Sequence, residues 1–202
     1  MKLKKVAALC AKSKHYTLFD KVDSTGEITQ WLGDGYSLYP LNGLPILDEE
    51  TLFAVLDVPE KQREKAVVHR DNMPGTFNAD DTDPAEIALN EGDIPLILGG
   101  TVLQPLMTRK GITFIQRKYL EPLDDMLGMI QLFERVAADG QPYIVAKAGL
   151  LIAAIIMPYD AIKESFVLQL ENMAGECRRT LNSKAQEEQA AEENMQSSLF
   201  ES

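Results

Sequence analysis

The stretch PYIVAKAGLLIAAIIMPYDAIKESFVLQL, residues 142–170, constrains the fold of this chain more than any other. It contains two apolar runs rich in β-branched residues, which are separated by Lys147-Ala148-Gly149 and followed by Pro158. Short apolar runs bounded by turn residues are typical of buried strands. An amphipathic segment begins at Asp160 and reaches Gly175, a residue type that often follows the end of a helix. The stretch therefore predicts two buried strands, a proline break and a helix.

The same order of residue types occurs at two other places. The three junctions are Leu44-Pro45-Ile46-Leu47-Asp48, Leu120-Glu121-Pro122-Leu123-Asp124 and Ile156-Met157-Pro158-Tyr159-Asp160. In each one a proline ends a strand or turn, and an Asp then offers its carboxylate to the free amides at the start of a helix. The three junctions predict a weak internal repeat.

The N-terminal part of the chain predicts a helix, a three-stranded meander, a second helix and a further strand. Leu3, Val6 and Cys10 recur at helical spacing between lysines, so Cys10 is expected in the apolar core. Asp23-Ser24-Thr25-Gly26 predicts a hairpin turn. The expected ranges are 3–14 for the helix, 16–22, 27–32 and 36–41 for the meander, a helix after Asp48, and a strand over 66–70.

Residues 71–93 differ in composition from the rest, with two prolines, two glycines and few aliphatic residues. Such a stretch predicts an irregular connection between two halves of the protein. Asp80, Asp81 and Asp83 suggest a calcium loop, but the central glycine and terminal glutamate of that loop are missing. We therefore expect no metal site here.

The second half of the chain predicts three strands and a helix before residue 142. The strands are expected over 94–98, 102–108 and 112–120, and Gly99-Gly100 is expected to form a bend, because no phosphate-loop ending follows it. The helix is expected over 123–137, where apolar residues recur on one helical face at 123, 126, 127, 130, 133 and 137.

These elements predict an α+β protein with a mostly antiparallel sheet and about four helices. The predicted body is a single compact domain over residues 1–178, with two pseudo-repeated halves at about 1–70 and 94–178 joined by the irregular segment 71–93. A flexible polar tail is expected over 179–202. Strands and helices in this order are loosely similar to those of DNA sliding-clamp domains.

The charge balance argues against binding nucleic acid or an anionic membrane through the whole surface, because the formal net charge is −11. Two local basic groups stand out nevertheless. The first consists of Lys2, Lys4, Lys5, Lys12 and Lys14, and the second of Arg109, Lys110, Arg117 and Lys118. Solvated surface charge accounts for both groups, and the second group is also a candidate contact for nucleic acid.

The residues that commonly carry catalysis are few. The chain has two histidines, His15 and His69, and two cysteines, Cys10 and Cys177, and none of them has the spacing of a metal or nucleophile motif. We therefore expect a protein that is not an enzyme and has no cofactor. Two unpaired cysteines, no signal-peptide pattern and no apolar run of membrane length predict a cytoplasmic protein without a membrane partner.

The C-terminal end carries the one functional motif, Gln196-Ser197-Ser198-Leu199-Phe200. It resembles the pentapeptide with which many bacterial proteins of DNA metabolism dock on the sliding clamp. Gln196, Ser198, Leu199 and Phe200 match that pattern, whereas Ser197 stands where leucine is most common. An apolar pair at the end of a polar segment can anchor in a partner's pocket, while Gln supplies hydrogen bonds.

We therefore expect a non-catalytic binding or regulatory protein of bacterial or phage DNA replication or repair, tethered to the clamp by its tail. One alternative is a clamp-like or oligomeric scaffold in which the tail is incidental. Another is an enzyme or DNA-binding module that uses residues 109–118 and 71–93. The sequence predicts neither the ligand of the body nor the oligomeric state.

Overall fold

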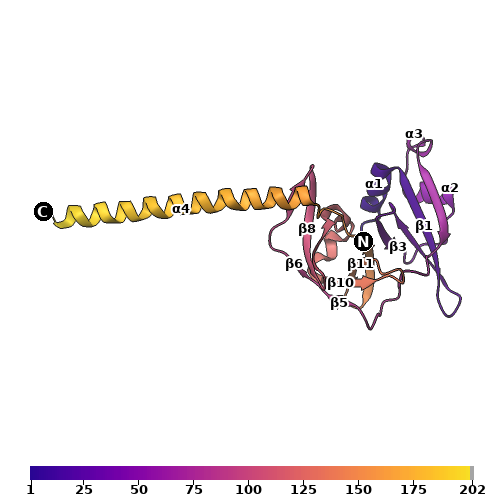
Figure 1. Cartoon of the computed structure of the whole chain (residues 1–202). Coiled ribbons are helices and arrows are strands. Elements are labelled where there is room, and N and C mark those ends of the chain that lie inside the picture. Colours follow the sequence, from indigo (N-terminus) through magenta and orange to yellow (C-terminus); the bar gives the residue numbers. More distant parts are fainter. Residues whose placement is uncertain (201–202) are drawn as a thin grey trace. The chain divides into compact units, whose positions relative to one another are not determined.

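The computed structural model describes the backbone of residues 1–200 and the side chains of residues 1–191. The chain divides into two compact units, Met1–Tyr159 and Asp160–Ser202 (Figure 1). Every described strand belongs to the first unit, and the second unit contains one helix, α4 (Glu164–Phe200). This combination confirms the α+β class.

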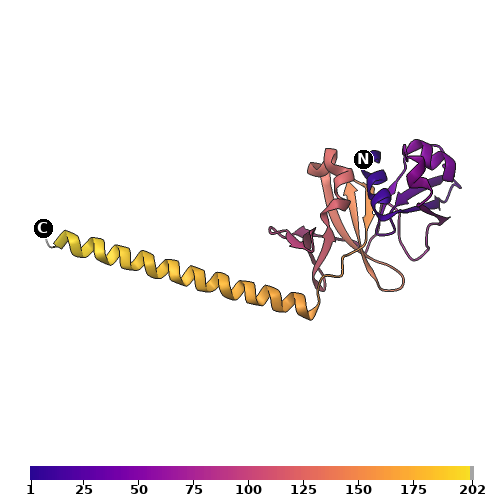
Figure 2. The same cartoon turned by 90° about the horizontal axis from the view of Figure 1, so that it is seen from above.

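An eight-stranded mixed sheet runs through the first unit in the order β4-β1-β2-β3-β12-β11-β10-β5 (Figures 1 and 2). Its strands are β1 (His15–Val22), β2 (Ile28–Gly33), β3 (Ser37–Pro40), β4 (Val67–Asn72), β5 (Ile87–Ala88), β10 (Ile130–Val136), β11 (Pro142–Ala148) and β12 (Leu151–Ile156). Neighbouring strands are antiparallel except β1 and β4, which are parallel. The connection that parallel pairing requires contains α2 (Glu49–Val55) and α3 (Glu60–Arg63).

A second, antiparallel sheet is built around one long strand, β8 (Thr101–Thr108). It pairs with β6 (Asn90–Glu91), β7 (Leu96–Leu98) and β9 (Gly111–Gln116). The strands predicted in this part of the sequence are thus present, although β9 ends earlier than expected. Two 3-10 helices, η1 (Arg117–Tyr119) and η2 (Glu121–Met129), follow β9.

The N-terminal helix and the capped helix are confirmed with small shifts at their ends. Helix α1 (Leu3–Ser13) buries Val6, Leu9 and Cys10 and ends at Lys14, whose φ of 62° leaves the helical region. At α2 the Asp48 carboxylate accepts a hydrogen bond from the Thr51 amide at 2.9 Å. The Thr51 hydroxyl accepts one from the Asp48 amide at 2.8 Å, which completes a capping box.

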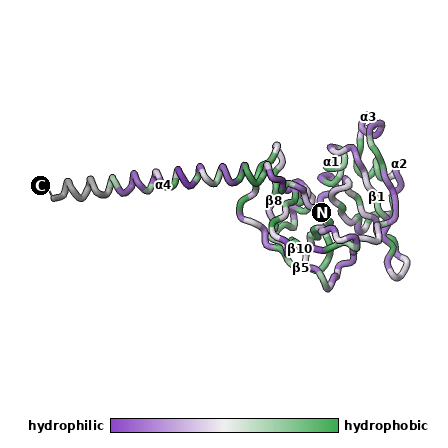
Figure 3. The backbone as a smooth tube through the Cα atoms, viewed as in Figure 1, coloured by the Kyte–Doolittle hydropathy of each residue, from purple (hydrophilic) through white to green (hydrophobic). Residues whose placement is uncertain are grey.

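The middle of the eight-stranded sheet is buried on both faces, which explains the continuous apolar runs of β11 and β12. On β11, Ile144 and Ala146 join a large core that also contains residues of α1, α2 and the second sheet. Tyr143 and Val145 point to the other face, where a smaller core includes Trp31. In the hydropathy colouring of Figure 3, green stretches lie mainly in the first unit, whereas α4 is largely purple and pale after its green first turns.

The predicted helix over 123–137 is wrong. Residues 121–129 form η2, and residues 130–136 form β10, which pairs with β11 from Ile130–Ala148 to Val136–Pro142. The strand was hidden in the sequence because Glu134 and Arg135 are both buried, at 3% and 1% exposure. Two buried charged residues side by side abolish the alternation of apolar and polar residues that identifies a strand.

The Asp-capped repeat holds at only one of its three junctions. Asp48 caps α2, but η2 has no side-chain cap, and α4 begins at Glu164 instead of directly after Asp160. The two halves share a three-stranded meander, and their last strands, β3 and β12, pair with each other in one sheet. Outside the meanders the halves differ, since β4 is parallel to β1 and β5 is antiparallel to β10.

The boundary between the units lies after Tyr159 rather than after residue 178. Helix α4 continues past Gly175, so residues 179–200, which we predicted to be a flexible tail, have helical backbone. After Gly175 the sequence contains no proline or glycine and is rich in Ala, Glu and Gln, which are strong helix formers.

Candidate functional site

The predicted clamp-binding residues belong to the last turns of α4. The backbone of Gln196, Ser198, Leu199 and Phe200 is helical, and their side chains lie outside the described residues. The second unit contains no other described helix or strand.

The four candidate nucleic-acid contacts do not form one surface. Arg109 and Lys110 occupy the turn between β8 and β9, whereas Arg117 and Lys118 follow the other end of β9. Six residues of extended strand separate the two pairs by about 20 Å. Arg109 is also committed to contacts inside the first unit, because its guanidinium donates to the Ala85 carbonyl and lies 3.7 Å from the Glu134 carboxylate.

A buried ion network lies under the irregular 71–93 segment. The Arg135 side chain has no exposed surface, and its guanidinium donates to the Glu86 carboxylate from Nε at 2.9 Å and from Nη2 at 2.5 Å. The same guanidinium donates to the carbonyls of Asn78 and Asp80 at 2.9 and 2.7 Å. Lys147 donates to the second Glu86 oxygen at 2.8 Å, so Glu86 joins both cations.

Glu86 is the carboxylate that both cations of this network contact directly, and Asp83 lies 3.9 Å from Nε of Arg135. Burial alone would raise the pKa of Glu86, but hydrogen bonds from Lys147 and Arg135 outweigh it, and the pKa is lowered. The Lys147 ammonium also lies 5.0 Å from the centroid of the Phe133 ring. The network therefore holds 71–93 against β10 and β11, which is a structural role that the sequence did not indicate.

The three aspartates that suggested calcium have separate partners. Asp80 pairs with Lys21 at 2.8 Å, and Asp81 accepts a hydrogen bond from the Ile152 amide at 2.8 Å. Asp83 accepts from the Asn78 side chain at 3.0 Å and from the Ala85 amide. Among the described residues, no group of three or more His, Cys, Asp or Glu is arranged to hold a metal ion.

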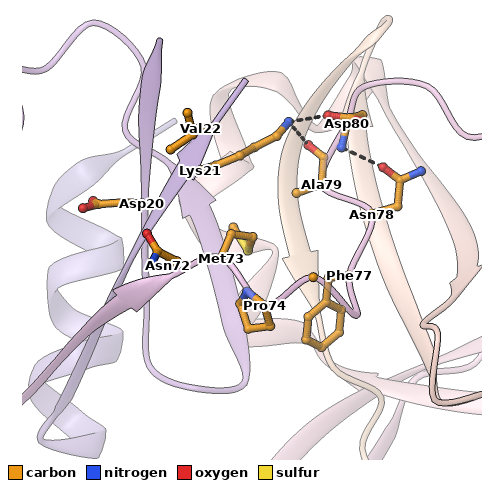
Figure 4. A pocket seen from close by; sticks show the side chains of 11 residues that line it. Asp20, Lys21, Val22, Asn72, Met73, Pro74, Phe77, Asn78, Ala79 and Asp80 are labelled. Atoms are coloured by element: carbon orange, nitrogen blue, oxygen red, sulfur yellow. Dashed lines mark hydrogen bonds and ion pairs between the residues drawn. The ribbon is translucent and has the colours of Figure 1, made fainter. Parts of the chain in front are cut away.

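A pocket of about 350 Å³ opens between β1, the end of β4 and the segment 73–80 (Figure 4). Asp20 and Lys21 are neighbours on β1 and point in opposite directions. The Lys21 ammonium donates to the Ala79 carbonyl at 2.7 Å and pairs with Asp80, while Asp20 pairs with Arg70. Met73, Pro74 and Phe77 supply the apolar part of the lining.

The titratable groups that line this pocket do not form a free pair of acid and base. Its titratable lining groups are Asp20, Lys21 and Asp80, and each is already held by an opposite charge. A smaller pocket of about 110 Å³ shares Lys21 with it and is lined by Trp31, whose buried indole nitrogen has no hydrogen-bond partner. Water is the simplest acceptor for such a donor.

The cysteine and histidines are placed apart from these pockets. Cys10 is buried, its thiol donates to the Gly33 carbonyl at 3.3 Å, and burial raises its pKa to about 12. At that pKa the thiolate needed for nucleophilic attack is scarce at neutral pH. His69 packs edge-on against Phe19, and His15 is exposed at the start of β1.

Comparisons with protein-family models, with curated proteins and with solved structures found no match for this chain. In the part of the chain that the structure describes, no helix has both the length and the apolar character needed to cross a membrane.

Proposed function

We propose that this protein is a non-catalytic binding or regulatory protein of bacterial or phage DNA metabolism, which docks on the sliding clamp through its C-terminal peptide. The observation that carries the proposal is the sequence Gln196-Ser197-Ser198-Leu199-Phe200, two residues from the C-terminal end. Four of its five positions match the clamp-binding pattern.

The composition around the peptide supports this role. Residues 182–194 contain no aliphatic side chain larger than alanine, so Leu199 and Phe200 have few apolar neighbours in the sequence. An adjacent pair of large apolar residues in such a context is suited to a partner's pocket, where a few buried anchors supply most of the binding energy.

The first unit is consistent with a binding role. The charged groups that line the 350 Å³ pocket are each paired with an opposite charge, and the buried ion network positions a loop. Neither arrangement supplies a nucleophile beside a base, which acyl or phosphoryl transfer requires. We assign the first unit to binding or regulation and the C-terminal peptide to tethering.

The test is the affinity of the full chain for a purified bacterial sliding clamp. Replacing both Leu199→Ala and Phe200→Ala removes the two anchors, each worth about 1–2 kcal/mol, so the affinity should fall by about a hundredfold. Met195→Ala is the matched control, because it removes an apolar side chain one position before the motif, and it should change the affinity by less than about twofold.

A further inference from the structure

A second pocket, of about 280 Å³, is lined by three segments of the first unit that lie far apart in the sequence. Lys12 comes from the last turn of α1, and Gly100 and Thr101 come from the turn between β7 and β8. Gln116, Arg117 and Lys118 come from the end of β9 and from η1. The fold thus joins Lys12 of the first basic group with Arg117 and Lys118 of the second, which the sequence keeps separate.

Contacts between α1 and η2 fix Lys12 at this position. The Lys2 amide donates to the Pro122 carbonyl at 2.7 Å, and the Lys5 ammonium pairs with the Asp124 carboxylate. Lys5 and Lys12 are seven residues apart, which places both on the same face of the helix. The ion pair at Lys5 therefore turns Lys12 toward the side where η1 and η2 lie.

The cations of this pocket lack the partners that other cations of the first unit have. Arg135 and Lys147 share Glu86, Lys21 holds Asp80, and Arg109 lies beside Glu134. Within the described residues, by contrast, Lys12 and Arg117 form no hydrogen bond or close ion pair through their side chains, although Arg117 lies near enough to Asp124 to help lower the pKa of that carboxyl. Three cations against the one carboxylate of Glu121 leave the lining of this concave site with net positive charge, which favours an anionic ligand.

The remaining lining groups determine the kind of anion. Lys118 has its ammonium 4.6 Å from the centroid of the Tyr119 ring, which leaves its charge available, and Thr101 and Gln116 offer hydrogen-bond donors. At Gly100 an added Cβ would meet no atom within 4 Å, so the turn leaves space beside the cations. Two ammonium groups with one guanidinium fork suit the oxygens of a phosphate group.

We propose that this pocket binds the phosphate group of a small phosphorylated molecule. The pocket volume lies at the lower end of the range for small-molecule sites, at roughly 300 Å³. The net charge of −11 repels a long polyanion more than a single phosphate, so a free nucleotide fits better than a nucleic-acid strand. This site is independent of the C-terminal peptide.

The test is isothermal titration of the full chain at low salt with inorganic phosphate, with adenosine monophosphate and with a twelve-nucleotide single-stranded DNA. Adenosine monophosphate should bind, and the double variant Lys12→Ala with Arg117→Ala should weaken its binding by at least about tenfold, since two charged contacts are lost. The matched control is Lys4→Ala with Lys110→Ala, which removes the same charge outside the pocket and should alter binding by less than about twofold.

A gain of affinity tests the same site without removing a cation. Glu121 also lines the pocket, and its carboxylate repels an anion there. Glu121→Gln should therefore strengthen the binding of adenosine monophosphate by roughly threefold to tenfold. Thermal unfolding of each variant without ligand shows whether the fold is retained, and Glu121→Gln keeps the test decisive if the double variant unfolds.

Three results would overturn the proposal. The first is that neither phosphate nor adenosine monophosphate binds at millimolar concentration. The second is that the pocket variant and the control variant bind adenosine monophosphate equally well. The third is tighter binding of the DNA strand than of adenosine monophosphate, with the same loss in both double variants, which would indicate a diffuse basic surface instead of a pocket.

Discussion

Glu86 bridges two cations, Arg135 and Lys147, that both lie in the interior of the first unit. Only 15% of the Glu86 side chain is exposed, and the Arg135 side chain is completely buried. Removing the charge from one partner of a buried ion pair leaves the other without compensation, and this loss costs far more than the intact pair contributes. The stability of the first unit should depend strongly on this one carboxylate.

The first prediction is that Glu86→Gln lowers the free energy of unfolding by about 3–5 kcal/mol, as measured by urea denaturation. Asp80→Asn is the control, because it removes the partner of Lys21 at a carboxylate that is 72% exposed. An exposed pair contributes about 1 kcal/mol or less. Equal effects of the two substitutions would show that the network is not a main source of stability.

The second prediction concerns pH. The pKa of Glu86 is lowered from its ordinary value of 4.5, so the unfolded state takes up the proton first as the pH falls. The stability that Glu86 contributes is present above about pH 4.5 and is lost as the pH falls through its folded pKa. In urea denaturation between about pH 3 and 7, the free energy of unfolding should therefore fall less steeply with decreasing pH in Glu86→Gln than in the natural chain.

Part of the loss of stability at low pH should remain in Glu86→Gln. Burial would raise the pKa of Asp20, but hydrogen bonds from Arg70 and Gln30 lower it, so this second carboxylate contributes to the same slope. Identical slopes in the variant and the natural chain would contradict the role assigned to Glu86.

At the scale of elements, the turn between β2 and β3 is the most restrictive backbone position. A Cβ added to Gly33 would lie 1.5 Å from the Ser37 carbonyl oxygen, so the backbone of the turn would have to move. The Asp34 carboxylate accepts hydrogen bonds from the amides of Tyr36 and Ser37, each at 3.0 Å, which holds the turn closed. Glycine at this position is thus required by the close approach of two backbone segments.

The third prediction is that Gly33→Ala destabilises the protein by about 3 kcal/mol or more, because the clash involves backbone atoms that cannot rotate away. Gly75→Ala is the control, since its Cβ would meet no atom within 4 Å and its φ is not in the left-handed region. That change should stay within about 1 kcal/mol. Thermal denaturation of both variants measures the difference. If Gly33→Ala is as stable as the natural chain, the turn does not depend on a glycine at this position.

The elements that could be predicted are those in which the local order of apolar and polar residues matches the burial of the side chains in the fold. Asp48 and Thr51 identify the start of α2, and the apolar runs of β11 and β12 reflect burial on both faces of the sheet. Strand β10 escaped prediction because Glu134 and Arg135 are buried with distant partners. No local pattern carries that information, since the partners Arg109 and Glu86 are more than twenty residues away in the sequence.

At the scale of the whole molecule, the division of the chain was predicted less well than its strands. The body was expected to be one domain whose halves are joined by residues 71–93, and the strands of both halves do form one sheet. The boundary with the C-terminal unit, however, lies after Tyr159 and not after residue 178. The carboxylates of Asp80, Asp81 and Asp83 each have a different partner, namely Lys21, the Ile152 amide and the Asn78 side chain. The pocket with Lys12 and Arg117 was also beyond prediction, because it needs the packing of α1 beside η2.

The clamp-binding motif could be proposed from the sequence alone. A partner recognises the side chains of a short docking peptide, and this recognition does not depend on the fold of the rest of the chain. Ser197 is the position at which this chain departs from the common pattern. Replacing it with leucine adds an apolar side chain that can be buried against the clamp, worth about 1.5 kcal/mol or more if burial is complete. The affinity of the chain should then rise by about tenfold.

The most direct test of the account is one titration of a bacterial sliding clamp with three full-length chains. These are the natural chain, the Ser197→Leu variant, and the variant with both Leu199→Ala and Phe200→Ala. We predict that Ser197→Leu binds most tightly, that the natural chain binds about tenfold more weakly, and that the double variant binds about a hundredfold more weakly than the natural chain. No binding by the natural chain, or one affinity shared by all three, would contradict the assignment of the C-terminal peptide as a clamp tether.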